Sequence, residues 1–241
     1  MSFSPRRVFP VIAFALGITL VLAATPVVAQ ASVKNPTAKS VLKAALKAMS
    51  KVSGVHIYVT STQGTVTSVV VVDIGATYGQ ESITSGKSHV QIIVTPTDAY
   101  LSGSPTGLTQ LMRLTAAEQK AVGTHAVLMK AGTSPYESFH SNLTTGVLTG
   151  ILPAAKGTKF KVGGGKHSKD YQLSWKTSAS TTSTATKSVL TISSGSKTLP
   201  VNEVITGTNG GGKTKFSNWG EHVVERAPAL ANTIPYAKVF G

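Results

Sequence analysis

One stretch of the sequence matches a nucleotide-binding motif letter for letter. Residues 207–214 read Gly-Thr-Asn-Gly-Gly-Gly-Lys-Thr, which fits the pattern G-x-x-x-x-G-K-[ST] of a phosphate-binding loop. In that loop a helix begins at the lysine, because the N–H groups and dipole of its first turn hold the phosphates. Here Lys213 opens a strand-like run, and Gly220 and Pro228 follow closely. We therefore interpret residues 207–214 as a glycine-rich hairpin turn.

Histidine, acidic and serine residues show no other catalytic pattern. The six histidines are His56, His89, His125, His140, His167 and His222. None pairs with another histidine or a glutamate at a metal-binding spacing such as H-E-x-x-H. The nine acidic residues are dispersed, and no G-x-S-x-G nucleophile motif occurs. The sequence predicts no catalytic residue, no metal site and no cofactor, so we do not expect an enzyme.

Four lysines at four-residue spacing form the clearest charged feature of the chain. They are Lys39, Lys43, Lys47 and Lys51. They fall within residues 36–52, whose apolar side chains recur at helical spacing and predict an amphipathic helix that ends at Gly54. Like charges at this spacing cost a helix a few tenths of a kcal/mol per pair. The lysines either form a solvated face or contact an anionic surface, and the sequence leaves both interpretations open.

The elements around these residues follow the order helix, strands, helices, strands. Runs with a period of two predict strands, separated by Gly, Ser, Thr and Asp. These runs cover residues 55–59, 66–74, 88–94, 99–101, 159–162, 171–175, 188–192, 199–205, 213–216 and 222–226, and residues 125–130 form a possible further strand. Residues 177–187 are rich in Ser and Thr, and the strands that bracket them favour a long hairpin loop over a linker.

Two helices are predicted in the middle of the chain. Thr115 and Glu118 have the spacing of a capping box, and Gly123 ends that helix. Ser134 and Pro135 begin the second helix with the same device, and its apolar face continues to Leu152. The order of elements predicts an α+β fold, with a strongly curved antiparallel sheet and helices segregated to one face. No domain boundary or internal repeat is visible, so residues 32–241 are expected to form one domain.

The first 31 residues have the pattern of a secretory signal peptide. Arg6 and Arg7 precede an apolar stretch at residues 8–24, and the triplet Ala29-Gln30-Ala31 offers a cleavage site. The alternative is an uncleaved anchor, because residues 8–31 are long enough to cross a bilayer core of about 30 Å. We expect a protein that is secreted or located in the extracytoplasmic cell envelope.

Composition narrows the chemistry of the exported chain. The sequence has no cysteine, which excludes disulfides, thiol catalysis, Cys-ligated zinc and the lipidated cysteine of a bacterial lipoprotein. The net charge is +14, and cleavage after Ala31 removes two arginines and no acid, which leaves +12. A protein of this charge is attracted to anionic phospholipid headgroups, wall polymers or nucleic acid in a salt-dependent manner.

Several short motifs agree in order with a known family. In the C-terminal part they are Leu-Pro-Val at 199–201, Thr-Lys-Phe-Ser-Asn-Trp-Gly at 214–220, Val-Val at 223–224 and Ala-Pro at 227–228. The lysine-rich first helix leading into Val55-His56, the strand that ends in Ala99-Tyr100-Leu101 and the helical insert agree as well. The chain therefore resembles the actinobacterial LppX/LprG-type envelope lipoproteins, within the wider LolA-like lipoprotein-carrier fold. Unlike typical members, it has no lipobox cysteine.

The resemblance implies a β half-barrel with helices over its concave face, enclosing an apolar cavity for the acyl chains of a lipid or other acylated molecule. The expected lining is Leu108, Leu111, Met112, Leu148, Ile151 and Leu152 from the helical insert, with Val71, Ile92 and Val94 from the sheet. The missing cysteine favours a diffusible carrier or binder, and we expect a monomer. The alternative is a basic envelope-associated module that binds an anionic membrane or wall polymer through Lys39, Lys43, Lys47 and Lys51. No nucleic-acid partner is expected.

Overall fold

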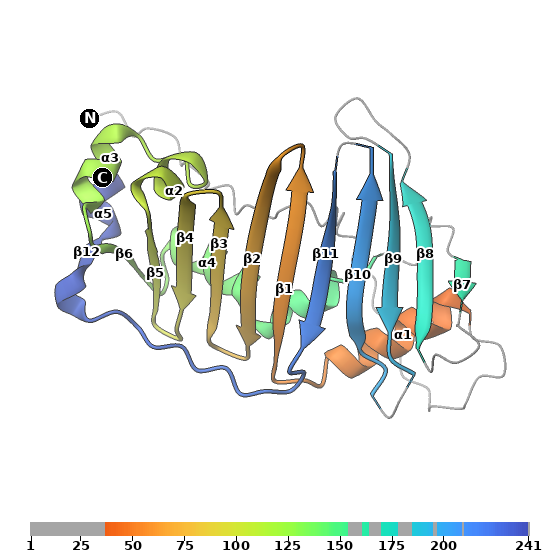
Figure 1. Cartoon of the computed structure of the whole chain (residues 1–241). Helices are drawn as coiled ribbons and strands as arrows, with labels where there is room; N and C mark the ends of the chain where they lie inside the picture. Colours follow the sequence, from red (N-terminus) through yellow and green to blue (C-terminus); the bar gives the residue numbers. More distant parts are fainter. Residues whose placement is uncertain are drawn as a thin grey trace.

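A computed structural model of the chain describes residues 37–153, 161–163, 170–177, 185–194, 197–208 and 210–240. In these residues one sheet has twelve strands in the order β12-β6-β5-β4-β3-β2-β1-β11-β10-β9-β8-β7 (Figure 1). The neighbours β12 and β6 are parallel, and all other neighbouring pairs are antiparallel. The predicted signal peptide, residues 1–31, lies outside the described residues.

The first strand lies near the centre of the sheet, between β2 and β11. The strands are β1 (Gly54–Gln63), β2 (Val66–Gly75), β3 (Gly79–Ser85), β4 (Ser88–Val94), β5 (Asp98–Gly103), β6 (Ala126–Lys130), β7 (Lys161–Gly163), β8 (Tyr171–Thr177), β9 (Thr186–Ile192), β10 (Pro200–Gly207), β11 (Gly210–Ser217) and β12 (Thr233–Pro235). Both edge strands, β7 and β12, have only three residues. The helices are α1 (Ala38–Met49), α2 (Pro105–Gln110), α3 (Ala116–Val122), α4 (Ser134–Leu143), α5 (Tyr236–Phe240) and the 3-10 helices η1 (Thr145–Gly150) and η2 (Leu230–Asn232).

The helix ends follow local capping chemistry. The Thr37 side chain accepts a hydrogen bond from the Ser40 backbone N–H and starts α1. Thr115 and Glu118 form the predicted capping box of α3, which is confirmed. The equivalent prediction for α4 is wrong, because its N-cap is Thr133, which makes no side-chain cap bond. The long apolar face predicted after it is not one helix either, since α4 ends at Leu143 and η1 follows.

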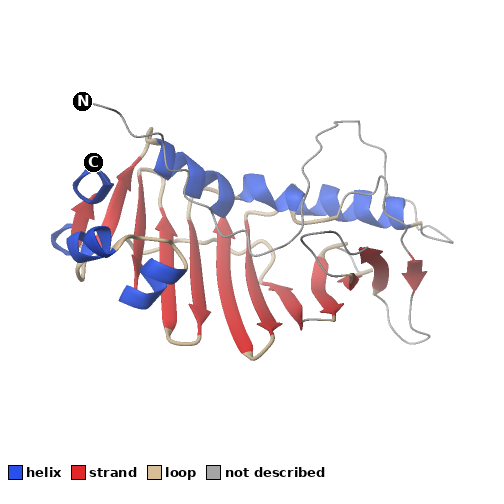
Figure 2. Cartoon of the chain, turned by 90° about the horizontal axis from the view of Figure 1, so that it is seen from above, coloured by secondary structure: helices blue, strands red, loops and turns tan. Residues whose placement is uncertain are grey.

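Helices α1 and α4 lie along the same face of the sheet, which we term the covered face (Figure 2). The buried apolar side chains on this face form two clusters. The α1 cluster joins α1 and residues 148–152 to strands β1, β2, β8, β9 and β11. The α4 cluster joins helices α2 to α5 to strands β4, β5 and β6. The sheet is thus roofed in two sections by different helices.

Gly79 on β3 allows the end of α4 to approach the sheet. A Cβ atom at this position would lie 2.0 Å from the carbonyl oxygen of Leu143, the last residue of α4. No real Cβ occupies such a position, so either the helix end or the strand would have to move. The lack of a side chain at Gly79 therefore fixes how closely α4 packs on the centre of the sheet.

The α+β class and the open, largely antiparallel sheet are confirmed, whereas the half-barrel curvature stays a prediction. The hairpin predicted at residues 207–214 is confirmed for its described residues, since Gly207 pairs with Gly210 and both Lys213 and Thr214 lie within β11. The strand predicted at 222–226 is wrong, because these residues have no regular structure. Most of the Ser/Thr-rich loop lies outside the described residues, but β8 and β9 pair on either side of it. Among the described helices, none is both long and apolar enough to cross a membrane.

Candidate ligand-binding site

Eight of the nine residues predicted to line a cavity pack on the covered face, in two separate groups. Leu148, Ile151 and Leu152 are buried in the α1 cluster. Ile92, Val94, Leu108 and Met112 are buried in the α4 cluster, with Leu111 partly buried against it. The structure therefore does not bring all of the predicted lining into one place. Their role as ligand contacts stays a prediction.

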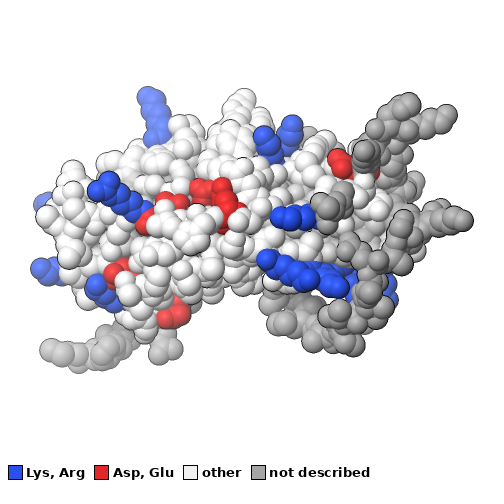
Figure 3. All heavy atoms as spheres, turned by 90° about the horizontal axis from the view of Figure 1, so that it is seen from below, with Lys and Arg blue, Asp and Glu red and all other residues white. Residues whose placement is uncertain are grey.

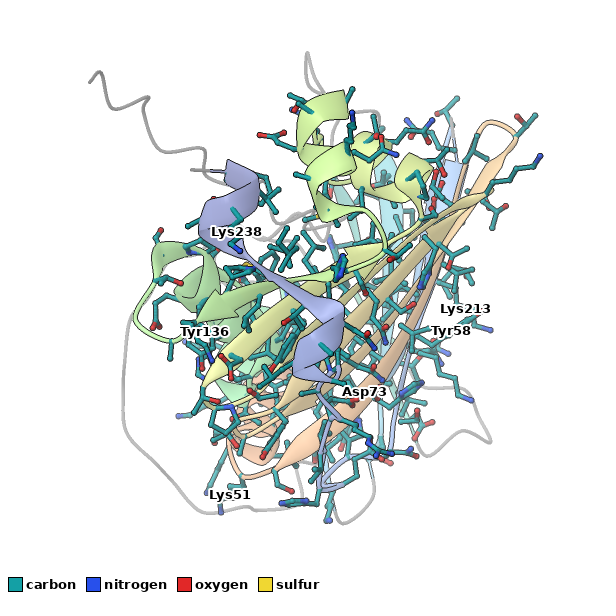
Figure 4. The ribbon with its side chains drawn as sticks, turned by 90° about the vertical axis from the view of Figure 1, so that its left-hand side faces the viewer. Lys51, Tyr58, Asp73, Tyr136, Lys213 and Lys238 are labelled. Atoms are coloured by element: carbon teal, nitrogen blue, oxygen red, sulfur yellow. The ribbon has the colours of Figure 1, made fainter. Side chains whose placement is uncertain are left out.

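Val71 lies on the opposite face from the other eight. Successive residues of a strand point to opposite faces, and Val72 packs against both clusters. Val71 pairs instead with Tyr58, which is 39% exposed. Figure 4 shows Tyr58 and Lys213 on one side of the sheet and Tyr136, from α4, on the other. A site on the covered face would thus use Val72 where the sequence suggested Val71.

The middle of the covered face is less buried than its two sides. Val59 on β1, Val72 on β2 and Glu81 on β3 point to this face and remain partly exposed, as does Val147 on η1 above them. We term these four residues the central patch. Next to it, Ile57 and Ile92 are almost fully buried. At Val72, where the two clusters meet, the side chains of the covered face are therefore less completely buried than Ile57 and Ile92 beside them.

Two glutamates on the covered face have perturbed acidity. Glu81 lies between Val72 and Ile92 on the neighbouring strands, and Glu203 on β10 lies between Leu190 and Thr214. Burial raises the pKa of the Glu81 carboxyl from 4.5 to about 7, and it raises the pKa of Glu203 to about 7 as well. The cause is loss of hydration, which penalises the charged form. Both side chains therefore gain or lose a proton near neutral pH.

The two carboxyl groups are too far apart to act on one atom. They lie on β3 and β10, with β2, β1 and β11 between them. Four steps of about 4.8 Å across the sheet separate them by roughly 19 Å along its surface, whereas paired catalytic carboxylates lie within about 10 Å. In the described part of the chain, no three His, Asp or Glu side chains are grouped to hold a metal ion. The glutamates are thus separate buried acids.

The sequence reasoning missed both glutamates because it compared acidic residues only with one another. The signal that could have identified them is their position within the alternation of each strand. Glu81 stands two residues from Ile83 on β3, and Glu203 stands two residues from Ile205 on β10. A charged residue in step with the inward-facing apolar side chains of a strand indicates a buried charge.

A second polar group lies on the uncovered face and was also missed. His56 Nδ1 lies 2.5 Å from Asp73 Oδ1, and Gln80 Nε2 donates to Asp73 Oδ2 at 2.8 Å. Glu225 lies nearby, and its pKa is raised first by burial and second by the charge of Asp73. The His56, Asp73 and Gln80 side chains connect β1, β2 and β3. We interpret the group as a structural link between strands.

The lysines of α1 and of the turn that follows it form an exposed row. Lys39, Lys43, Lys47 and Lys51 are all exposed, whereas Val41, Leu42, Ala45 and Met49 of the same segment are buried in the α1 cluster. Figure 3 shows a band of positive side chains along α1. The row faces away from the sheet, and the central patch lies on the other side of the roof. The two predicted binding features are therefore separate surfaces.

A shallow hollow of about 620 Å³ lies at the tips of two hairpins. The described residues that line it are Gln63, Gly64, Thr208 and Gly210. It is open to solvent and has few side chains to contact a ligand. We therefore place the candidate site at the central patch.

No protein-family model matches this sequence, and no curated protein matches it. Two solved structures are similar in shape. The lipoprotein LppX of Mycobacterium tuberculosis is 14% identical over 78% of this chain and 99% of its own, with a TM-score of 0.47. LprF of Mycobacterium bovis is 14% identical over 79% of this chain and 96% of its own, with a TM-score of 0.43. These structural neighbours belong to the LppX/LprG group that the sequence motifs resemble. TM-scores below 0.5 transfer neither a ligand nor a role.

Proposed function

We propose that the protein is exported and binds a lipid or another acylated molecule against the central patch, as a monomer outside the cytoplasm. The observation that carries this proposal is the exposure of Val59 and Val72 in the middle of a helix-covered face. A filled core is close-packed and leaves no such surface at its centre. An acyl chain lying along this surface is removed from water, which contributes about 0.8 kcal/mol for each buried methylene.

In this proposal the covered face is the concave side of a half-barrel, and helices α1 and α4 form its roof. The buried side chains on either side of the central patch, such as Ile92 and Leu148, are the walls. Apolar binding of this kind needs few polar contacts, because the free energy comes from burial. No catalytic step is part of the proposal.

Purified wild-type protein should carry bound lipid, and Val72→Trp should carry at least fivefold less. The indole ring occupies the space proposed for the acyl chain, so the chain no longer fits between the sheet and the helices. The full chain is expressed with its N-terminal segment so that it is exported, and native mass spectrometry with lipid extraction then measures the bound lipid per protein.

Val71→Trp is the matched control, because it places the same ring one residue away on the uncovered face. It should carry as much lipid as the wild type. Circular dichroism confirms that both variants fold. A wild-type protein free of lipid, or equal loading of the two variants, would contradict the proposal.

A second candidate function is contact with an anionic membrane or wall polymer through the exposed lysine row of α1. The protein should be retained on vesicles that contain anionic phospholipid at low salt and released as the Debye length falls to about 8 Å near 0.15 M salt. Replacement of Lys39, Lys43, Lys47 and Lys51 by glutamine should remove most of this retention. The matched control replaces four exposed lysines of the uncovered face, Lys176, Lys187, Lys213 and Lys215. An equal loss in the control would show that overall charge, and not the row, is responsible.

A further inference from the structure

Three buried polar side chains lie together on the covered face beside the central patch. Glu203 is 6% exposed, Thr214 is 3% exposed and Ser188 is 5% exposed. Glu203 and Thr214 are directly paired across β10 and β11, so their Cβ atoms are about 5 Å apart. Ser188 pairs with Ile205 and is the diagonal neighbour of Glu203 on β9. We term these three residues the polar cluster.

The polar cluster is unusual because its members have no partners. Within the described part of the chain, none of the three side chains makes a hydrogen bond or an ion pair. Buried polar groups in proteins are hydrogen-bonded in about nine cases of ten, and a buried carboxyl left alone is costlier than a hydroxyl. Among the described residues, Asp98 Oδ1 is the side-chain oxygen that is fully buried without a hydrogen bond, so the oxygen atoms of Glu203, Thr214 and Ser188 keep some contact with solvent. They are therefore within reach of a partner from outside the chain.

The charge on the covered face limits what that partner can be. The neighbouring strands β8, β9 and β11 carry four lysines, Lys176, Lys187, Lys213 and Lys215. Because successive residues of a strand point to opposite faces, each of these lysines points to the uncovered face. Glu81 and Glu203 are thus the charged groups that the described strands β1–β4 and β8–β11 turn toward the covered face. On these strands an anionic headgroup would meet two carboxyl groups and no positive side chain.

We propose that the polar cluster holds the headgroup of the bound molecule, an inference that rests on the proposed function. The Glu203 carboxylate accepts hydrogen bonds from this headgroup, which therefore carries donors and bears no negative charge. Sugar or glycerol hydroxyls and an ammonium group share this chemistry. Thr214 lies next to Val59 of the central patch, so an acyl chain along the patch brings its polar end to the cluster. Thr214 and Ser188 hydroxyls donate to or accept from the same headgroup. The raised pKa of Glu203, caused by burial, agrees with a carboxyl that has no partner of its own.

Three probes with one dodecyl chain and different headgroups test this inference. Dodecyl glucoside supplies hydroxyls, dodecylamine supplies an ammonium group, and dodecyl phosphate is anionic. Calorimetric titration of the delipidated full chain at pH 8, with each probe below its critical micelle concentration, gives the three affinities. The wild type should bind glucoside and amine at least tenfold more tightly than phosphate.

Glu203→Gln keeps the size of the side chain and should lower the ratio of amine to phosphate affinity at least tenfold. If the affinity for glucoside falls less than the affinity for amine in this variant, headgroup hydroxyls are sufficient for binding. If the two affinities fall equally, both headgroups need the carboxylate as an acceptor. Thr214→Val, which keeps the shape of the side chain, should weaken glucoside binding two- to fivefold. Glu221→Gln, in the segment after β11, is the matched control and should leave all three affinities unchanged.

Binding of all three probes with similar affinity in the wild type would overturn the headgroup inference while leaving the acyl-binding function standing. A headgroup preference that survives in both Glu203→Gln and Thr214→Val would overturn it as well. If none of the three probes binds, the proposed function itself is overturned, and the inference with it.

Discussion

Replacement of Phe139 by alanine should lower the free energy of unfolding by about 3–5 kcal/mol. Phe139 is 2% exposed and lies on the side of α4 that faces the sheet, within the α4 cluster. Alanine removes most of the apolar surface that the ring buries and leaves a cavity. The cavity cannot close, because the end of α4 is already in contact with β3 at Gly79. Urea denaturation followed by circular dichroism measures the loss.

Ser141→Ala is the matched control for this substitution. Ser141 lies on the same helix but is exposed, and its hydroxyl bonds only to the Ser138 carbonyl oxygen. Its replacement should change stability by no more than about 0.5 kcal/mol. A loss below about 1 kcal/mol for Phe139→Ala would show that α4 does not pack on the sheet as described.

Glu203→Gln should make the protein more stable than the wild type at pH 8 by about 3 kcal/mol, and equally stable near pH 4. The pKa of Glu203 is about 7 in the folded protein, against a reference value of 4.5. Between these values the folded protein holds a proton that the unfolded chain has lost. The wild type therefore loses stability as pH rises from 4.5 to 7, and glutamine, which mimics the protonated acid, does not.

Thermal and urea unfolding of both proteins at pH 4, 5.5, 7 and 8 measures this difference. Glu81→Gln should show the same pH window, because burial raises the pKa of Glu81 to about 7 as well. A difference between variant and wild type that stays constant across the four pH values would show that the Glu203 carboxyl is not held away from water.

The strands that could be predicted from the sequence are those with strong apolar alternation. Residues 66–74 and 88–94 are rich in Val and Ile and were identified close to their true bounds. The strand β3, Gly79–Ser85, was missed because Ile83 is its single large apolar residue. It is held by pairing with β2 and β4 on both sides, which no local pattern reveals. Conversely, residues 222–226 look like a strand, but they pair with nothing in the described structure.

Short-range signals were more informative for the helices. The capping box at Thr115 and the stop at Gly123 act within a few residues, so the sequence contains all of the information for α3. The break between α4 and η1 lies instead where Leu143 approaches Gly79 and Thr144 forms a bridge with Gly75, which are contacts between residues far apart in the chain. Such long-range contacts limit what periodicity can predict.

The candidate site could be predicted only in part, because its geometry depends on strand register. The sequence identified apolar residues near the site, and most of them lie on the covered face. A register shift of one residue exchanges Val71 for Val72 and turns Glu203 from the interior to solvent. The polar cluster also joins residues from β9, β10 and β11 that share no sequence motif. These relations become visible only when the pairing of strands is known.

The two edges of the sheet bear on how the protein behaves at high concentration. An unpaired edge strand offers backbone N–H and C=O groups to another molecule, and long flat edges promote fibre growth. Here both edges are strands of three residues, and β12 ends in Pro235, which has no N–H to donate. In the described part of the chain, copies of this protein therefore have little edge on which to extend one another's sheet, which favours dispersed molecules over end-to-end aggregates at high concentration.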